Sequence, residues 1–334
     1  MKCATFCFDE FPIASTITFD LDAGGPLLSG PLIDGRLGDF RLVWNRRGWD
    51  PVLPADLNED DRRLVAPVCR RYCDELRLSP PDGQLWVNSR ASQLAMRSKA
   101  LQLQIATGLG FQIPETLVTN DPAAARRFVG RPGEFIVKSI SPMRWEEEGK
   151  VIALHTSKIT VDELEDEDAV RACPMVYQRL IEKRYELRVI VFGDDILWVK
   201  IHSQDSGRYG LDWRKGIAEE LRLEEVPPPD GAAEKIRAYC RAAGLVHGSF
   251  DLAVTPEGGI VFFEVNEQGQ TLWIEEVNED IAVFDTLNRF LWRESSGEPA
   301  PWRDQRLLLR DYLDLSLGSG PPAESAAASG SRLV

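Results

Sequence analysis

The stretch that decides the fold runs from residue 248 to residue 266 and reads GSFDLAVTPEGGIVFFEVN. Two apolar runs, Leu252–Val254 and Ile260–Phe263, flank a Pro-Glu-Gly-Gly sequence that is typical of a turn. The pattern therefore predicts two largely buried β-strands joined as a hairpin.

Three oxygen-bearing side chains lie on these two strands. Glu264 and Asn266 are two residues apart and so face the same side, and Asp251 can meet them from the partner strand. Two carboxylates and an amide on one buried face are costly unless a cation compensates, and hard oxygen ligands suit Mg²⁺. The alternative is that they are solvated acids at two strand ends. The hairpin alone leaves both interpretations open.

Composition excludes several other classes of protein. The 334 residues are 43% hydrophobic and 28% charged, with a net charge of −14, which argues against a general nucleic-acid or anionic-membrane binder. The sequence has no apolar run of membrane-spanning length and no N-terminal signal pattern. Six scattered cysteines without metal-ligand spacing predict reduced thiols. We therefore expect a cytoplasmic protein with no nucleic acid and no membrane among its partners.

Turn-rich and apolar segments predict an α/β chain of several units. We expect strands at Lys2–Phe8 and Arg41–Trp44, a break at Ser79–Gly83 and one helix over Ser92–Leu109. Glu186–Phe192 and Ile196–His202 predict a second hairpin, and 161–170 predicts a solvated acidic helix or loop. The predicted units are residues 1–84, 85–174 and 175–317, followed by a disordered tail, 318–334.

A set of charged residues precedes the hairpin along the chain. Lys99 lies on the predicted helix and Lys138 ends a predicted strand, where each is either a surface residue or a cation for phosphate. A possible linker strand over Gln178–Ile181 follows, and then Glu186 and Arg188, which share one strand face. Together these residues favour a nucleotide site. It would have cations for the phosphates, a linker beside the base, an acid for the ribose hydroxyls and ligands for a metal ion.

These motifs resemble the ATP-grasp superfamily, and more narrowly the graspetide (microviridin-type) maturases of ribosomally made peptides. The resemblance is carried by Tyr185–Val189, Ile201–Gln204, Asp212–Arg214, Phe263–Gln270 and Trp273–Glu275, and it spans roughly residues 85–290. It implies an α+β ATP-grasp fold with an N-terminal pre-ATP-grasp domain.

The resemblance also implies roles for individual residues. The phosphates of ATP would meet Lys99 and Lys138, the adenine would lie against Gln178, Arg179, Leu180 and Ile181, and the ribose would be held by Glu186. Mg²⁺ would bind Asp251, Glu264 and Asn266. The transferring phosphoryl group would be stabilised by Arg188 and, near the acceptor, by Arg214. Substrate contacts would come from His202, Ser203, Gln204, Asp212, Trp213 and Gln270, although a lone histidine such as His202 is more often structural.

The implied reaction is carboxylate activation. An Asp or Glu side chain of a precursor peptide attacks the γ-phosphate of ATP, and a hydroxyl or amine captures the acyl phosphate to close a macrolactone or macrolactam. Such a reaction needs positioning and charge neutralisation rather than a protein nucleophile. The implied partners are a precursor peptide with a leader segment and a possible second copy of the chain. The alternatives are a RimK-like ligase that adds a free amino acid, and a scaffold that only binds.

Overall fold

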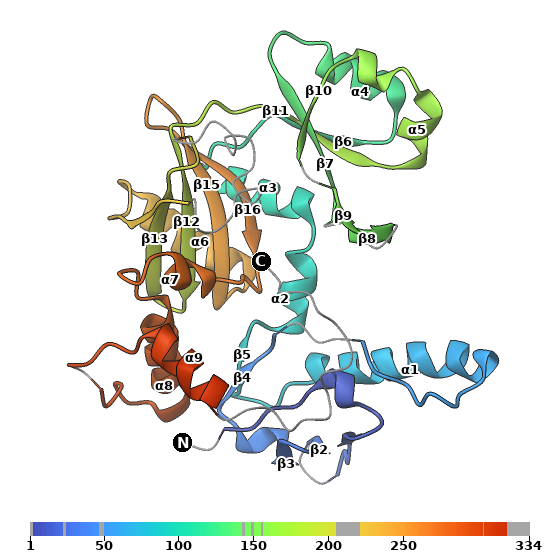
Figure 1. Ribbon diagram of the computed structural model, residues 1–334, viewed down its shortest axis with the longest axis vertical. Helices are drawn as coiled ribbons and strands as arrows, with labels where there is room; N and C mark the ends of the chain where they lie inside the picture. The colour runs from blue at the N-terminus through green and yellow to red at the C-terminus, as the bar shows by residue number, and fades with distance from the viewer. Residues whose placement is uncertain are drawn as a thin grey trace.

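The computed structural model describes residues 3–22, 25–46, 50–141, 144–147, 150–154, 156–204, 221–302 and 304–318. Helices and strands are mixed throughout, which confirms the predicted α/β class. The chain forms three parts, with an N-terminal unit at the bottom of Figure 1, a five-stranded sheet in the middle and a four-stranded sheet at the top.

The N-terminal unit packs a small antiparallel sheet and a parallel strand pair under one long helix. Its elements are β1 (Thr16–Thr18), β2 (Leu27–Gly30), β3 (Ile33–Arg36), β4 (Leu42–Trp44), α1 (Glu59–Leu78) and β5 (Leu85–Val87). The predicted strand at Arg41–Trp44 is confirmed as β4, but the one at Lys2–Phe8 is wrong. Residues 3–7 join no strand, and a 3-10 helix begins at Phe8. Phe6 and Phe8 are instead partly buried by packing on the cluster beneath α1.

The four-stranded sheet has the strand order β10-β7-β11-β6, and all its pairs are antiparallel. This part contains β6 (Thr116–Thr119), α4 (Pro122–Val129), β7 (Phe135–Ser139), β8 (Arg144–Glu147), β9 (Lys150–Ala153), β10 (Ser157–Ile159), α5 (Glu167–Ala172) and β11 (Met175–Arg179). The acidic segment forms a 3-10 turn, Asp162–Leu164, and the first half of α5. It is not wholly solvated, because Leu164 and Val170 are buried in the core of this part.

The five-stranded antiparallel sheet is the centre of the molecule, with the order β14-β13-β12-β15-β16. Its elements are α3 (Lys99–Gly108), β12 (Tyr185–Phe192), β13 (Asp195–Ile201), β14 (Leu223–Glu225), α6 (Ala232–Ala243), β15 (His247–Val254), β16 (Ile260–Asn266), α7 (Trp273–Val277), α8 (Val283–Ser296) and α9 (Leu309–Gly318). Both predicted hairpins are confirmed, as β12–β13 and β15–β16. Gly193 turns the first with a φ of +61°, a conformation that favours glycine.

The two faces of this sheet are used differently. Leu187, Val189 and Val191 of β12 point to a core shared with α3 and α6. On the opposite face, Ile190 and Phe192 pack against α7 and α8, and so cover only one end of the sheet. Because side chains alternate along β12, Glu186 and Arg188 lie on that same face, at its other end. Among the described residues, the buried charges of β12 therefore lie at the end of the sheet away from α7 and α8.

The predicted helix over Ser92–Leu109 is in fact two helices, α2 (Arg90–Ala95) and α3. The break falls after Ala95 because Ser98 caps a new helix, its side chain accepting a hydrogen bond from the Leu101 N–H at 3.3 Å. Met96 is fully buried in the turn. The break places Lys99 at the first position of α3, close to β16.

Asn88 fastens the N-terminal unit to the central sheet. It is buried, and its amide nitrogen donates to the carbonyls of His247 and Glu267 at 2.7 and 2.6 Å. Its oxygen accepts from the N–H groups of Val246 and His247. All these partners lie far away in sequence, so one short side chain fixes the relative position of two parts of the fold.

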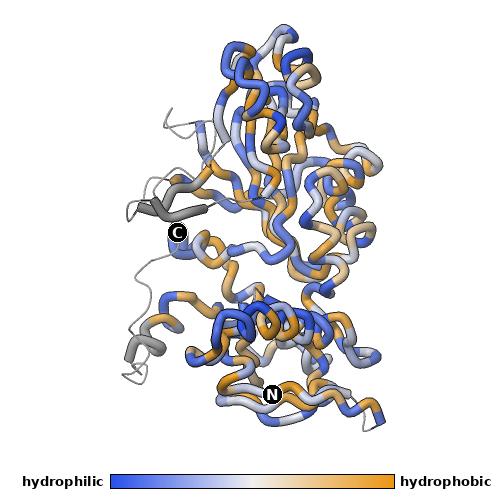
Figure 2. Tube along the Cα trace, turned by 90° about the vertical axis from the view of Figure 1, so that its right-hand side faces the viewer, coloured by the Kyte–Doolittle hydropathy of each residue, from blue (hydrophilic) through white to orange (hydrophobic). Residues whose placement is uncertain are grey.

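Hydrophobic and hydrophilic residues alternate over short distances along the trace in Figure 2. In agreement with this pattern, none of the described helices is long and apolar enough to cross a membrane.

Candidate active site

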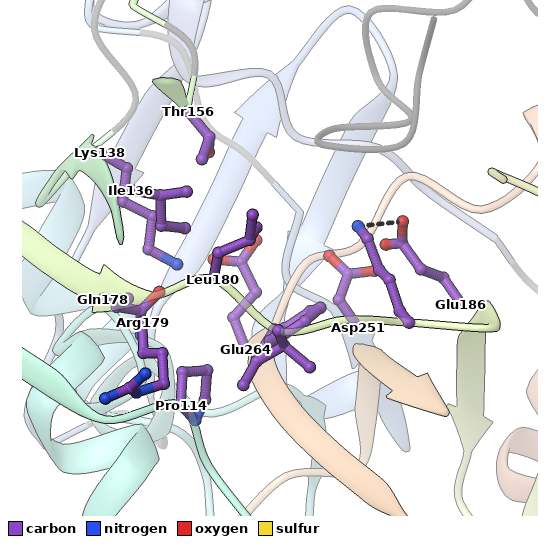
Figure 3. Close-up of a pocket in the computed structure, with 13 residues that line it drawn as sticks. Pro114, Ile136, Lys138, Thr156, Gln178, Arg179, Leu180, Glu186, Asp251 and Glu264 are labelled. Atoms are coloured by element: carbon purple, nitrogen blue, oxygen red, sulfur yellow. Dashed lines mark hydrogen bonds and ion pairs between the residues drawn. The ribbon is translucent and has the colours of Figure 1, made fainter. Parts of the chain in front are cut away.

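A pocket of about 100 Å³ lies between the four-stranded and five-stranded sheets. Figure 3 shows Lys138 and Ile136 entering it from β7, with Asp251 and Glu264 facing them from β15 and β16. The residues that line it are Pro114, Ile136, Lys138, Thr156, Gln178, Arg179, Leu180, Ile181, Lys183, Glu186, Asp251, Phe263 and Glu264. The pocket thus collects most of the predicted nucleotide residues and two of the predicted metal ligands.

The register of the β15–β16 hairpin brings the predicted metal ligands together. Asp251 lies directly opposite Glu264, and Asn266 lies opposite Ser249 on the same face. The register then shifts, so that Leu252 pairs with Phe262 and Phe263 is an extra residue on β16. This bulge lets Phe263 line the pocket together with Glu264.

Each of the two carboxylates is paired with a cation from another element. The Arg188 guanidinium donates to Asp251 Oδ1 at 2.6 Å, and both side chains are only 6% exposed. Lys99 Nζ lies 2.6 Å from Glu264 Oε2. Neither Arg188 nor Lys99 lines the pocket itself. They lie beside its carboxylates, where they lower the cost of burying two negative charges.

Glu186 is buried in the pocket wall, as Asp251 is. Its Oε1 accepts from Lys183 Nζ at 2.7 Å, and both side chains are 7% exposed. Burial raises the pKa of Glu186 above its ordinary value, although the charge of Lys183 opposes this shift. A carboxyl group in this position is suited to hydrogen-bond a hydroxyl group, as a ribose-binding acid must.

The segment from Gln178 to Ile181, which comprises the end of β11 and the two residues after it, forms another wall. The Gln178 amide donates to the Thr116 hydroxyl at 2.9 Å, and the Arg179 side chain donates to Glu115 and to the Pro132 carbonyl. The backbone N–H groups of Arg179 and Leu180 also have protein partners, the carbonyls of Glu115 and Glu134. The Arg179 side chain is therefore held by protein partners, and its guanidinium points away from the cavity (Figure 3).

The residues predicted to contact the substrate do not gather in one place as the nucleotide residues do. Ser203 is buried and hydrogen-bonded to Gln204, and it also contacts Glu186. The His202 ring pairs with Glu224 Oε2 at 3.1 Å, which favours the structural interpretation of this histidine. Gln270 is exposed, and its carbonyl accepts from the Trp273 indole. Asp212, Trp213 and Arg214 lie outside the described residues.

Several residues of the site were missed by sequence reasoning, Ile136 and Thr156 of the pocket wall among them. Lys183 and Phe263 line the pocket, and neither has a periodic signal that separates it from its neighbours. Gln102 does not line it, but its side chain donates to the Val265 carbonyl at 2.9 Å and accepts from the Val265 N–H at 3.0 Å. Val265 lies between Glu264 and Asn266, so Gln102 positions both. A glutamine on the apolar face of a predicted helix was the available signal.

The donor set fits a magnesium ion that is completed by other ligands. Among the described residues no group of three or more His, Cys, Asp or Glu side chains is arranged to hold a metal. Asp251 and Glu264 supply two adjacent carboxylates and Asn266 an amide oxygen, which already accepts from the Gln268 N–H at 3.3 Å. Mg²⁺ is usually bound by few protein oxygens, and water and phosphate oxygens complete its coordination shell.

Comparison with solved structures defines the class. A RiPP-associated ATP-grasp ligase from Chryseobacterium gregarium, solved with ADP and a leader and core peptide, is 27% identical; the match covers 91% of this chain and 90% of that one, with a TM-score of 0.79. The macrocyclase MdnB of Microcystis aeruginosa is 28% identical over 84% and 88% of the two chains, with a TM-score of 0.64. No protein-family model and no curated protein sequence matches the chain.

The fold is therefore that of the ATP-grasp ligases, as the sequence motifs indicated. Within that class the chain is similar to ligases that act in the maturation of ribosomally made peptides. A further macrocyclase, MdnC of Microcystis aeruginosa bound to its precursor peptide, is 22% identical with a TM-score of 0.74, and it supports the fold alone.

Proposed function

We propose that this chain is an ATP-dependent ligase that activates Asp or Glu side chains of a ribosomally made precursor peptide and closes rings through them. The observation that carries the proposal is the pairing of Asp251 and Glu264 across one hairpin, in a pocket that Lys138 enters from the opposite sheet. This arrangement offers hard oxygen ligands and a phosphate cation on opposite walls of one cavity. The similarity to peptide-modifying ligases supports the same activity.

In this proposal the four-stranded sheet and the linker strand hold the nucleotide. Lys138 neutralises phosphate oxygens, Glu186 accepts from the ribose hydroxyls, and Ile136 and Leu180 provide apolar contacts for the base. Mg²⁺, held by Asp251, Glu264 and Asn266, supplies charge neutralisation for the phosphates.

The two cations that pair with these carboxylates, the buried Arg188 of β12 and the partly exposed Lys99 of α3, serve the chemical step. The peptide carboxylate attacks the γ-phosphorus of ATP, the bond to the ADP oxygen breaks, and an acyl phosphate and ADP result. Arg188 and Lys99 lie beside this position and stabilise the charge on the transferring phosphoryl group. A hydroxyl or amine of the same peptide then displaces phosphate and loses its proton, which closes an ester or amide ring.

The domain division and the partners belong to this proposal. The units 1–84, 85–174 and 175–317 place the nucleotide residues in the second and third units, and the precursor peptide would meet both. A homodimer and a cytoplasmic location stay predictions.

The test is incubation of the purified chain with ATP, Mg²⁺ and a precursor peptide encoded beside its gene, followed by mass spectrometry. We expect the peptide to lose one water per ring while ADP accumulates. A gain of one amino-acid residue mass would support the RimK-like alternative instead. ATP and peptide that both stay unchanged would contradict the proposed activity.

A further inference from the structure

A second cavity, of about 250 Å³, lies where α1, the end of β4, α2 and the turn after β16 meet. Its most common lining residue is arginine, at Arg46, Arg70, Arg77, Arg90 and Arg97. Among the described residues, the carboxylates that line it are those of Asp50 and Asp74. The chain as a whole carries a net charge of −14, so this excess of guanidinium groups runs against its overall balance. Cations gathered in a cavity favour the binding of an anion there.

Two of these arginines are buried with incomplete hydrogen bonding. Arg77 and Arg90 are 12% and 11% exposed, and both pair with the same atom, Asp74 Oδ1, at 3.4 and 2.9 Å. The Nε–H group of each is buried and has no hydrogen-bond partner among the described residues. Burial, and next the charge of Arg90, lower the pKa of Arg77. One carboxylate therefore pairs with two guanidinium groups, and both groups can donate further hydrogen bonds.

A third arginine is placed at the cavity without an anion. Arg97 lies in the turn between α2 and α3 and is exposed. Within the described part of the chain, no side chain pairs with its guanidinium group. By contrast, Arg70 is held by both oxygens of Asp50, at 2.9 and 3.2 Å. Arg97 is therefore positioned to meet an incoming anion.

The cavity is close to the proposed reaction site. Gln268, in its wall, follows the candidate metal ligand Asn266 by two residues, a span of at most about 7 Å along the chain. The wall is fixed, because Asn88 donates to the Glu267 carbonyl at 2.6 Å and the buried Gln93 is bonded to Asn45. In Figure 1, α2 stands between the N-terminal unit and the five-stranded sheet. A peptide at the reaction site would extend toward this cavity.

We propose that the arginine-lined cavity binds an acidic side chain of the peptide substrate other than the one being activated. This inference rests on the proposed function. Guanidinium groups match carboxylates with two parallel hydrogen bonds, which fixes position as well as charge. The peptide is thereby held at one acidic residue while a neighbouring one reaches the nucleotide, so the cavity selects precursors whose acidic residues are closely spaced.

The test measures binding of a capped hexaglutamate peptide, without nucleotide, by fluorescence anisotropy. Arg97→Glu is expected to weaken binding by about 10-fold, because a charge that attracts becomes one that repels. Arg237→Glu is the matched control, since Arg237 is exposed on α6, on the other face of the sheet. It should change the affinity by less than about 2-fold. Asp74→Asn should tighten binding, because it removes the carboxylate that competes for Arg77 and Arg90.

The outcomes separate this inference from the proposed function. Equal losses in Arg97→Glu and Arg237→Glu would show only a general effect of net charge and would overturn the inference. So would a capped hexaglutamine peptide that binds as tightly as hexaglutamate. Neither result depends on turnover. Conversely, ring closure that fails with every precursor tested, together with binding that responds to Arg97 and Asp74 as expected, would contradict the proposed function and keep the acidic-peptide site.

Discussion

At the scale of single residues, the site is built from carboxylates that are each matched by one cation. Removing one partner of a buried pair leaves the other charge uncompensated, which is more costly than never having the pair. Glu264 is paired with Lys99, lines the pocket and lies opposite Asp251. Its negative charge therefore has two uses, one in holding Lys99 and one in binding a metal.

Glu264→Gln should reduce peptide-dependent ADP release by at least about 100-fold, because the neutral amide is a poor ligand for Mg²⁺ and no longer holds Lys99. Glu257→Gln is the matched control, since Glu257 is exposed in the turn of the same hairpin. The measurement is a coupled assay for ADP with the precursor peptide. Equal rates in Glu264→Gln and the unmodified chain would remove Glu264 from the site.

His247 gives the molecule a defined response to pH. It is buried, stacks on Phe192 with ring centroids 4.9 Å apart, and contacts the Val191 carbonyl at 2.8 Å. Burial lowers its pKa from 6.5 to about 4. Between these two values the unfolded chain binds a proton that the folded chain excludes, so stability falls as the pH falls through this window. The contribution lost is on the order of 3 kcal/mol.

In His247→Phe, this part of the pH dependence should disappear, although the variant is less stable at pH 7. The measurement is the free energy of unfolding in urea at pH 7 and pH 5. Phe290→Leu is the control, because it weakens the same core cluster without removing a titrating group, and its pH dependence should equal that of the unmodified chain. A His247→Phe variant that loses as much stability on acidification as this control would show that His247 does not titrate in this window.

At the scale of elements, the sequence predicted the hairpins better than it predicted their details. Alternation and turn residues located β12–β13 and β15–β16 because burial of one face repeats every two residues. The extra residue Phe263 in β16 could not be predicted, since a bulge depends on the partner strand. The division into α2 and α3 was missed for a similar reason. The apolar pattern continues across Met96, and only the cap made by Ser98 marks a new helix.

The outer edge of strand β16 is bonded by a side chain of α3 as well as by the backbone of Gln112, whose carbonyl accepts from the Phe262 N–H at 2.8 Å. Gln102 of α3 is 1% exposed and bonds both backbone groups of Val265, and it also donates to the Met96 carbonyl at 2.6 Å. Gln102→Leu would leave these buried groups unpaired and should lower the free energy of unfolding by about 3 kcal/mol. Gln104→Leu, at an exposed position of the same helix, should leave stability within about 0.5 kcal/mol of the original.

Urea denaturation of the two variants measures this difference. Equal stability in both would mean that the bonds from Gln102 to β16 contribute little, and that β16 is held by the rest of the hairpin.

At the scale of the whole molecule, the candidate nucleotide pocket is formed by two sheets that have separate cores. Ile136, Lys138 and Gln178 come from the four-stranded sheet, whereas Asp251, Phe263 and Glu264 come from the five-stranded one. Of these, Lys138, Gln178, Asp251 and Glu264 were predicted from the sequence as site residues, whereas Ile136 and Phe263 were not. The sequence could not place any of them around one cavity, because that depends on how the two sheets pack. A nucleotide in this pocket would contact both sheets and so join them.

Binding of ADP with Mg²⁺ should therefore raise the melting temperature of the entire chain, and Lys138 should be needed for this effect. A compound present at 100 times its Kd adds about 2.7 kcal/mol to the stability of the folded state. Lys138→Ala removes a cation that reaches the pocket from β7 (Figure 3), and loss of a charged hydrogen bond should weaken the binding of ADP about 10-fold.

Lys158→Ala is the matched control, because Lys158 lies on the neighbouring strand β10, is 56% exposed and pairs with Glu134 at 2.5 Å. Differential scanning fluorimetry over a series of ADP concentrations gives the affinity of each variant. If Lys138→Ala and Lys158→Ala respond to ADP as the original chain does, the nucleotide binds elsewhere and the pocket between the sheets loses its proposed role.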